Sequence, residues 1–129
     1  MRETATPHPP ALCAQFHRAA ELIGRRWTGA IIFVLLGADC RFATLRDAIP
    51  DITDRMLSER LQELEQEGIL ERTVFPETPV RVEYSLTRKG RGLAAAFDAI
   101  ADWAHKFGAG PEAVKPRARR LGNPAPRRA

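Results

Sequence analysis

Two cysteines, Cys13 and Cys40, are the first candidates for chemistry in this sequence. Cys13 follows two prolines at the predicted start of a helix, where free backbone amides and the helix dipole stabilise an anion such as a thiolate. His17 lies one turn further on and Arg18 is close. A thiolate can attack a quinone or be oxidised to sulfenic acid, whereas a buried free cysteine is inert. The position of Cys13 alone leaves both interpretations open.

The cysteine count excludes two other roles. Two cysteines are too few for the disulfide scaffold of a small secreted domain, and they lack the number and spacing of a structural zinc site. Cys13 and His17 form an i, i+4 pair, but two ligands with no third in view rarely hold a metal. We therefore expect no metal and no other cofactor.

The elements that must position these residues follow from the spacing of apolar side chains. Helical periodicity predicts helices over residues 12–23, 27–36, 42–49, 54–67 and 88–107. Helix 27–36 is apolar on nearly all sides, which favours a place in the centre of the core. Thr53 is a good N-cap and Gly68 a good C-terminal stop for helix 54–67. Alternating apolar residues predict two strands, 69–75 and 80–86.

The order of these elements predicts a mainly α fold with a small β-hairpin. Only a few residues separate helices 42–49 and 54–67, which is the spacing of a helix-turn-helix. A hairpin directly after it is a wing, and the prolines that flank its turn restrict the tip. Arg81 stands beside this tip, where it could meet a phosphate. The predicted architecture is a winged helix-turn-helix.

Helix 54–67 has an outward face suited to reading DNA. If Leu57 marks the centre of the buried face, a step of about 100° per residue turns a polar set outward. Arg side chains, hydroxyls and amides can donate to bases or phosphates, and a carboxylate can accept from cytosine. The predicted contacts are Arg55, Ser58, Glu59 and Gln62 on this face, Thr53 with the free amides of the helix start, Arg41 before the preceding helix, and Arg81. The alternative is an ordinary solvated helix face.

Length and charge set the remaining bounds. A chain of 129 residues is long enough for one domain, which we place at residues 11–108 between a flexible arm (1–10) and a basic tail (109–129). The tail carries six basic residues against Glu112, which leaves residues 1–108 with a net charge of −1 out of the total of +4. The N-terminus lacks an apolar signal core and no apolar stretch is long enough to span a membrane, so a cytoplasmic protein is expected.

Several pieces of this sequence, in the right order and spacing, resemble the HxlR-type winged helix-turn-helix regulators, which are relatives of the MarR group. The matching pieces are Cys13, LIGRRW (22–27), RF (41–42), ITDRMLSERLQELEQEGILER (52–72), PETPVRVEYSLTRKG (76–90) and Trp103. They cover about residues 13–107. Within the family the chain looks most like the thiol-based sensors of quinones and disulfide stress.

The resemblance implies a homodimer that represses transcription from a pseudo-palindromic double-stranded DNA operator. In the family the first and last helices pack across the two-fold axis, and Cys13 stands at the position of the cysteine that senses a small electrophile or oxidant. The expected dimer interface contains Phe16, Phe97, Ile100, Trp103 and Phe107. The alternative is that the aromatic residues of the last helix pack within their own subunit.

The chain departs from the closest sensors in one respect. Those proteins carry a second cysteine just past the last helix, which bonds to the sensing cysteine of the other subunit, but no cysteine follows Phe107 here. A Cys13–Cys13 bond between subunits, a mixed disulfide with a small thiol, and alkylation of Cys13 all stay open. A Cys13–Cys40 bond depends on geometry that the sequence does not give.

Three other functions compete with this interpretation. The first is an enzyme, but the sequence lacks the motifs of an active site. It has no glycine-rich phosphate loop, no supported nucleophile–base pair and no carboxylate cluster. A winged helix used only for protein–protein contact would not need the basic positions Arg41, Arg55 and Arg81. The same fold could instead respond to a small ligand at the dimer interface.

Overall fold

The computed structural model of the chain describes residues 11–108. The expected arm, residues 1–10, and the expected basic tail, residues 109–129, lie outside the described residues. The described part divides into two units, with the boundary in the chain between Arg91 and Gly92.

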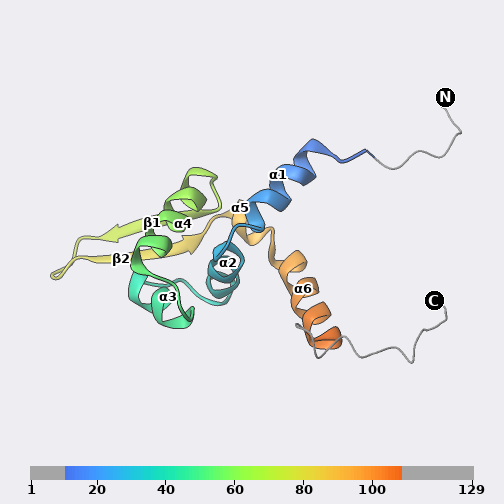
Figure 1. Cartoon of the computed structure of the whole chain (residues 1–129). Helices are drawn as coiled ribbons and strands as arrows, with labels where there is room; N and C mark the ends of the chain where they lie inside the picture. The colour runs from blue at the N-terminus through green and yellow to red at the C-terminus, as the bar shows by residue number, and fades with distance from the viewer. Residues whose placement is uncertain (1–10, 109–129) are drawn as a thin grey trace, which may run out of the picture. The chain divides into compact units, whose positions relative to one another are not determined.

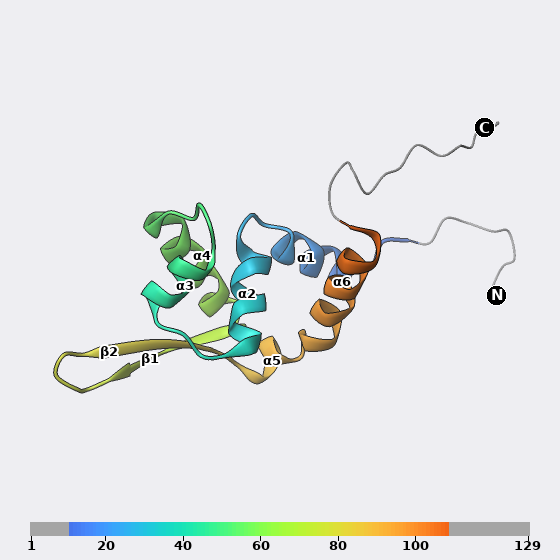
Figure 2. The ribbon, with the colours of Figure 1, turned by 90° about the horizontal axis from the view of Figure 1, so that it is seen from below.

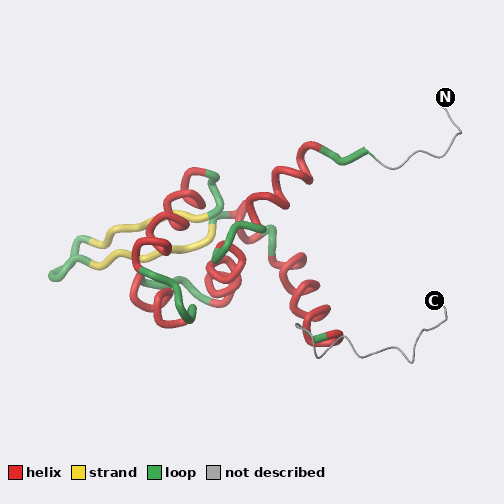
Figure 3. The backbone as a smooth tube through the Cα atoms, in the orientation of Figure 1, coloured by secondary structure: helices red, strands yellow, loops and turns green. Residues whose placement is uncertain are grey.

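The first unit contains five helices and a hairpin, in the order that the sequence predicts (Figures 1 and 3). Its elements are α1 (Ala14–Ile23), α2 (Thr28–Gly37), α3 (Phe42–Ala48), α4 (Asp54–Gln66), β1 (Leu70–Phe75), β2 (Arg81–Leu86) and the single turn α5 (Arg88–Arg91). The second unit is α6 (Ala94–Phe107). The predicted fold class, mainly α with a hairpin wing after a helix-turn-helix, is confirmed.

Helix α2 supplies the centre of the core. Its Ile31, Ile32 and Leu35 are completely buried, and the core also contains the apolar stripes of α3, α4 and the hairpin. Those stripes consist of Leu45, Leu57, Leu61, Leu64, Leu70 and Leu86. Two details differ from the prediction. Phe33 is 52 % exposed, and Trp27 precedes the helix in a left-handed conformation with φ 77°, because the chain turns sharply between α1 and α2.

Helix α4 begins and ends where its capping residues predict. The Thr53 hydroxyl accepts a hydrogen bond from the Met56 amide at 3.1 Å, which satisfies one of the free donors of the first turn. After the last turn Gly68 has φ +75°, a conformation that only glycine adopts without strain. The boundaries of this helix are therefore fixed by side-chain chemistry and by one glycine.

The hairpin is antiparallel, and its register pairs Leu70 with Leu86 at the base and Phe75 with Arg81 near the turn. A third segment touches it at one point, where Cys40 and Tyr84 exchange two backbone hydrogen bonds of 3.0 and 2.7 Å. In both ribbon views the strands run beside α3 and α4, and their turn projects beyond these helices (Figures 1 and 2).

The expected single helix over residues 88–107 is wrong, because the chain forms α5 and α6 with a break at Gly92 and Leu93. Thr87 does cap as predicted, but it caps α5, where its hydroxyl accepts from the Gly90 amide at 3.1 Å. Gly90 and Gly92 together weaken the helix at this point, since each glycine costs about 1 kcal/mol relative to alanine in a helix interior. Apolar periodicity alone does not register this cost.

None of the helices described between residues 11 and 108 has the length and apolar character needed to cross a membrane.

Gly90 packs so closely on the hairpin base that no side chain fits there. A Cβ atom at this position would lie 2.2 Å from the Ile69 carbonyl oxygen, whereas one at Gly37 would meet nothing within 4 Å. We expect Gly90→Ala to lower the free energy of unfolding by roughly 1–3 kcal/mol, and Gly37→Ala to leave it unchanged or raise it by about 0.5 kcal/mol. Urea unfolding followed by circular dichroism measures both, and equal stability of the two variants would refute the close packing.

Candidate nucleic-acid interface

The outward face of α4 carries the side chains that the sequence predicts for it. Arg55, Ser58, Glu59 and Gln62 are all exposed. The Arg55 side chain is 87 % exposed and pairs with Glu59 one turn on, at 3.3 Å between Nε and Oε2. An exposed pair of this kind contributes well under about 1 kcal/mol, so Arg55 can leave it for a base or a phosphate and Glu59 can leave it for a cytosine amine. Their contact with DNA stays a prediction.

Arg60, on the flank of the same helix, is buried and structural. It is 8 % exposed, and its Nε donates to the Arg26 carbonyl oxygen at 2.9 Å. Its guanidinium also pairs with Glu63 at 3.2 Å, and Glu63 reaches Arg25 at 3.3 Å. The buried charge is therefore matched by an acceptor and a carboxylate. These contacts join α4 to the loop between α1 and α2.

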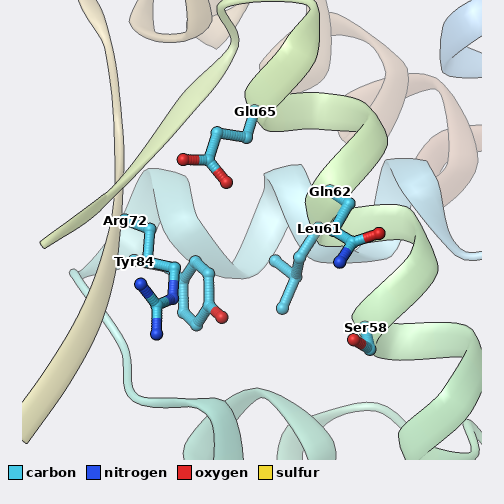
Figure 4. Close-up of a pocket in the computed structure, with 6 residues that line it drawn as sticks. All are labelled: Ser58, Leu61, Gln62, Glu65, Arg72 and Tyr84. Carbon is cyan, nitrogen blue, oxygen red and sulfur yellow. The ribbon is translucent and has the colours of Figure 1, made fainter.

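A polar hollow of about 460 Å³ lies between α4 and the hairpin (Figure 4). We call it the α4–hairpin hollow, and it is lined by Ser58, Leu61, Gln62, Glu65, Arg72 and Tyr84. Two of these residues, Ser58 and Gln62, belong to the predicted reading face. Arg72 and Tyr84 were not predicted, although the alternation of the strand after the buried Leu70 could have placed Arg72 on this side.

Arg81, which we expect to meet a phosphate beside the wing tip, has its guanidinium in contact with other side chains of the hairpin. Its guanidinium lies 3.8 Å from the centre of the Phe75 ring and forms ion pairs with Glu77, at 2.8 Å, and with Glu83. The hydrogen bond from Arg81 holds the pKa of the Glu77 carboxyl below its ordinary value, and the same bond raises the pKa of Arg81. The charge of Arg81 is thus matched inside the hairpin.

The two other predicted contacts lie at helix starts. Arg41 is exposed immediately before α3, and its charge also helps to lower the pKa of Glu77, after the larger effect of the Arg81 hydrogen bond. The Thr53 oxygen accepts the capping bond of α4, which leaves its hydroxyl proton to donate elsewhere. Both positions stay predictions as DNA contacts.

The two cysteines have opposite environments. Cys13 is exposed and is the residue before α1 rather than part of its first turn; its Sγ donates to the Gln15 side chain at 3.2 Å. Cys40 is 6 % exposed and donates to the Ala38 carbonyl oxygen at 3.3 Å. Burial, then the charges of Asp39 and Glu83, raise the pKa of the Cys40 thiol. Among residues 11–108 no three His, Cys, Asp or Glu residues gather as a metal site.

Large apolar side chains are exposed at most positions expected in a dimer interface. The exposed fractions are 64 % for Phe16, 55 % for Ile100, 60 % for Trp103 and 55 % for Phe107. The rings of Trp103 and Phe107 lie 6.2 Å apart on α6. Phe97 is only 6 % exposed and has little surface left to offer a partner. The interface itself stays a prediction.

Comparison with known proteins places this geometry in a family. A family model described as HxlR-like helix-turn-helix matches residues 22–111. The HTH-type transcriptional regulator YodB of Bacillus subtilis (strain 168) is 48 % identical over 96 residues, which are 74 % of this chain and 86 % of YodB. The HTH-type transcriptional regulator YvaP of the same organism is 47 % identical over 96 residues, covering 74 % and 89 % of the two chains.

Solved structures agree with the sequence comparison. The reduced form of YodB superposes with a TM-score of 0.68 and 47 % identity, covering 75 % of this chain and 95 % of that one. YodB has also been solved after diamide treatment and with quinone bound. The redox regulator HypR in its reduced form gives a TM-score of 0.68 at 34 % identity, covering 72 % and 92 %.

Helix α4 and the hairpin both lie within the residues that the family model matches. The protein therefore belongs to the HxlR-like helix-turn-helix family and is a DNA-binding transcriptional regulator.

Proposed function

We propose that the protein is a homodimeric repressor that releases a pseudo-palindromic operator when an electrophile or oxidant modifies Cys13. The observation that carries this proposal is the exposed Cys13 thiol immediately before α1. It occurs in a chain similar to YodB, a regulator solved in reduced, diamide-treated and quinone-bound forms.

The chemistry selects Cys13 over Cys40. A sulfur must be reached before it can react, and only the Cys13 thiol is exposed. Burial also raises the pKa of Cys40 and so reduces its thiolate fraction. Addition of the Cys13 sulfur to a quinone ring carbon forms a C–S bond, and the thiol proton ends on the reduced ring, so no further reactant is consumed. A disulfide between two Cys13 residues is the corresponding product of an oxidant such as diamide.

Contacts within the first unit supply a route from Cys13 to the DNA-reading helix. Cys13 immediately precedes α1, and α1 leads directly into the loop whose Arg25 and Arg26 bond Glu63 and Arg60 of α4. A displacement of α1 therefore acts on α4. Two reading helices in a dimer must stay about 34 Å apart to enter successive major grooves, so a small rotation of one subunit removes much of the affinity.

The dimer in this proposal uses the apolar face of α6. Ile100, Trp103 and Phe107 follow each other at i, i+3 and i+7, so they share one side of the helix. Exposed apolar residues gathered in this way mark a surface that meets another protein. A second copy of the chain is the partner that a two-fold operator requires.

We expect Arg55→Ala to relax the base preference of the protein, because an exposed guanidinium on this face of α4 can bind guanine. The loss should be roughly 1–3 kcal/mol of discrimination if the contact is bidentate. Competition binding with single-base variants of a selected duplex measures it. Arg18→Ala on α1 is the control, and an equal loss of discrimination in that variant would remove Arg55 from base reading.

Trp103→Ala should shift the protein from dimer toward monomer and lower operator affinity with it. The dimer should weaken because the truncation removes a large apolar ring from the face that would be buried. Sedimentation at micromolar concentration measures the shift. Asp98→Ala is the control, since residue 98 lies about 140° round the helix from Trp103. A wild-type protein that is monomeric while bound to operator would contradict the dimer.

Cys13→Ser should bind operator like the wild type but keep it after treatment with diamide or benzoquinone. Cys40→Ser should still respond, and mass spectrometry of treated wild-type protein should find the first adduct or disulfide on Cys13. If Cys13→Ser releases DNA as readily as the wild type, the thiol is not the sensor. A small ligand at the dimer interface would then be the better explanation of regulation.

A further inference from the structure

The two faces of the hairpin carry different side chains, and the strand register shows which residues lie on each face. Paired residues of an antiparallel hairpin point to the same side, and successive residues alternate. The buried pair Leu70–Leu86 marks the side that faces the helices. Two residues further on, the pair Arg72–Tyr84 lies on this same side. The pair Phe75–Arg81 is an odd number of residues away and lies on the opposite side.

On that opposite side, Arg81 is committed to contacts within the hairpin. It covers the Phe75 ring and pairs with Glu77 and Glu83, and its side chain is only 23 % exposed. A phosphate that approached Arg81 would have to displace two carboxylates and would meet their negative charge. The arrangement instead ties the turn of the wing to both strands.

On the helix side, Arg72 is exposed and opens into the α4–hairpin hollow. Figure 4 shows Arg72 and Tyr84 entering from the hairpin, while Ser58 and Gln62 enter from α4. Within the part of the chain that the structure describes, no carboxylate forms an ion pair with Arg72, although Glu65 lines the same hollow. Its charge is therefore available to a ligand.

At this point of the wing the hairpin is also bonded to a third segment of the chain. Tyr84 pairs with Arg72 across the hairpin, and its other edge exchanges two hydrogen bonds with Cys40. Arg72 starts from β1, and its partner strand β2 is held on the far edge by Cys40, so Arg72 is better positioned than a residue near the hairpin turn. The position of Arg72 relative to Ser58 and Gln62 is thus defined by the core of the fold.

We infer that Arg72 is the cation by which the wing binds a DNA phosphate, next to the bases read from α4, and that Arg81 is a structural residue of the wing. This inference rests on the proposed reading face of α4. A phosphate of the duplex fits the hollow because it would accept from the Arg72 guanidinium and from the hydroxyl and amide groups of Ser58 and Gln62.

The test compares Arg72→Ala, Arg72→Lys and Arg81→Ala in the full-length protein, with a duplex selected by the wild type from a random-sequence library. Affinity is measured over about 50–200 mM salt. Arg72→Ala should weaken binding about tenfold and lower the magnitude of the salt slope by about one. Arg72→Lys should restore the slope, since it keeps the charge. Arg81→Ala should keep the slope and instead lower the thermal midpoint of unfolding.

An unchanged slope for Arg72→Ala, or a slope lowered by Arg81→Ala, overturns the inference. Circular dichroism of each variant confirms that it is folded, which Arg72→Ala is expected to be because the side chain is exposed. If the wild type selects no duplex, the proposed reading of DNA by α4 fails as well. If Arg55→Ala alters selection while Arg72→Ala changes nothing, only the assignment of Arg72 fails.

Discussion

The bond between the buried Arg60 guanidinium and the Arg26 carbonyl oxygen is the constraint on which the arrangement of the first unit depends. It connects the flank of α4 to the turn that follows α1, and Glu63 extends the connection to Arg25. A buried guanidinium without these partners would carry a large desolvation penalty. The same polar contacts therefore connect the orientation of α4 to that of the loop that follows α1.

Much of this fold could be predicted from the sequence, because its boundaries are set locally. The spacing of Leu57, Leu61 and Leu64 defines the inner side of α4, and Thr53 and Gly68 define its ends. The same pattern turned the predicted DNA-reading residues outward. Even the position of Arg60 nearer the core follows from the helical period, although its partner at Arg26 does not.

The features that the sequence did not predict arise from contacts between elements. The charge pattern shows an arginine beside a hairpin turn, but whether Arg81 meets Glu83 or solvent depends on which residues the strand pairing brings to one side. The place of Arg72 in the α4–hairpin hollow depends on the same register together with the position of α4. By contrast, the break before α6 has a local cause in Gly90 and Gly92, which the apolar stripe from Leu93 onward does not reveal.

The contrast between the two cysteines makes the folded chain a natural subject for site-specific labelling. The sequence contains only Cys13 and Cys40, and only Cys13 is exposed in the folded unit. A maleimide spin label or fluorophore would therefore attach at one defined place, the start of α1, without any engineered substitution. In an assembly of two copies the pair of labels would form a molecular ruler, and the distance between them would report directly on the movement of one subunit relative to the other.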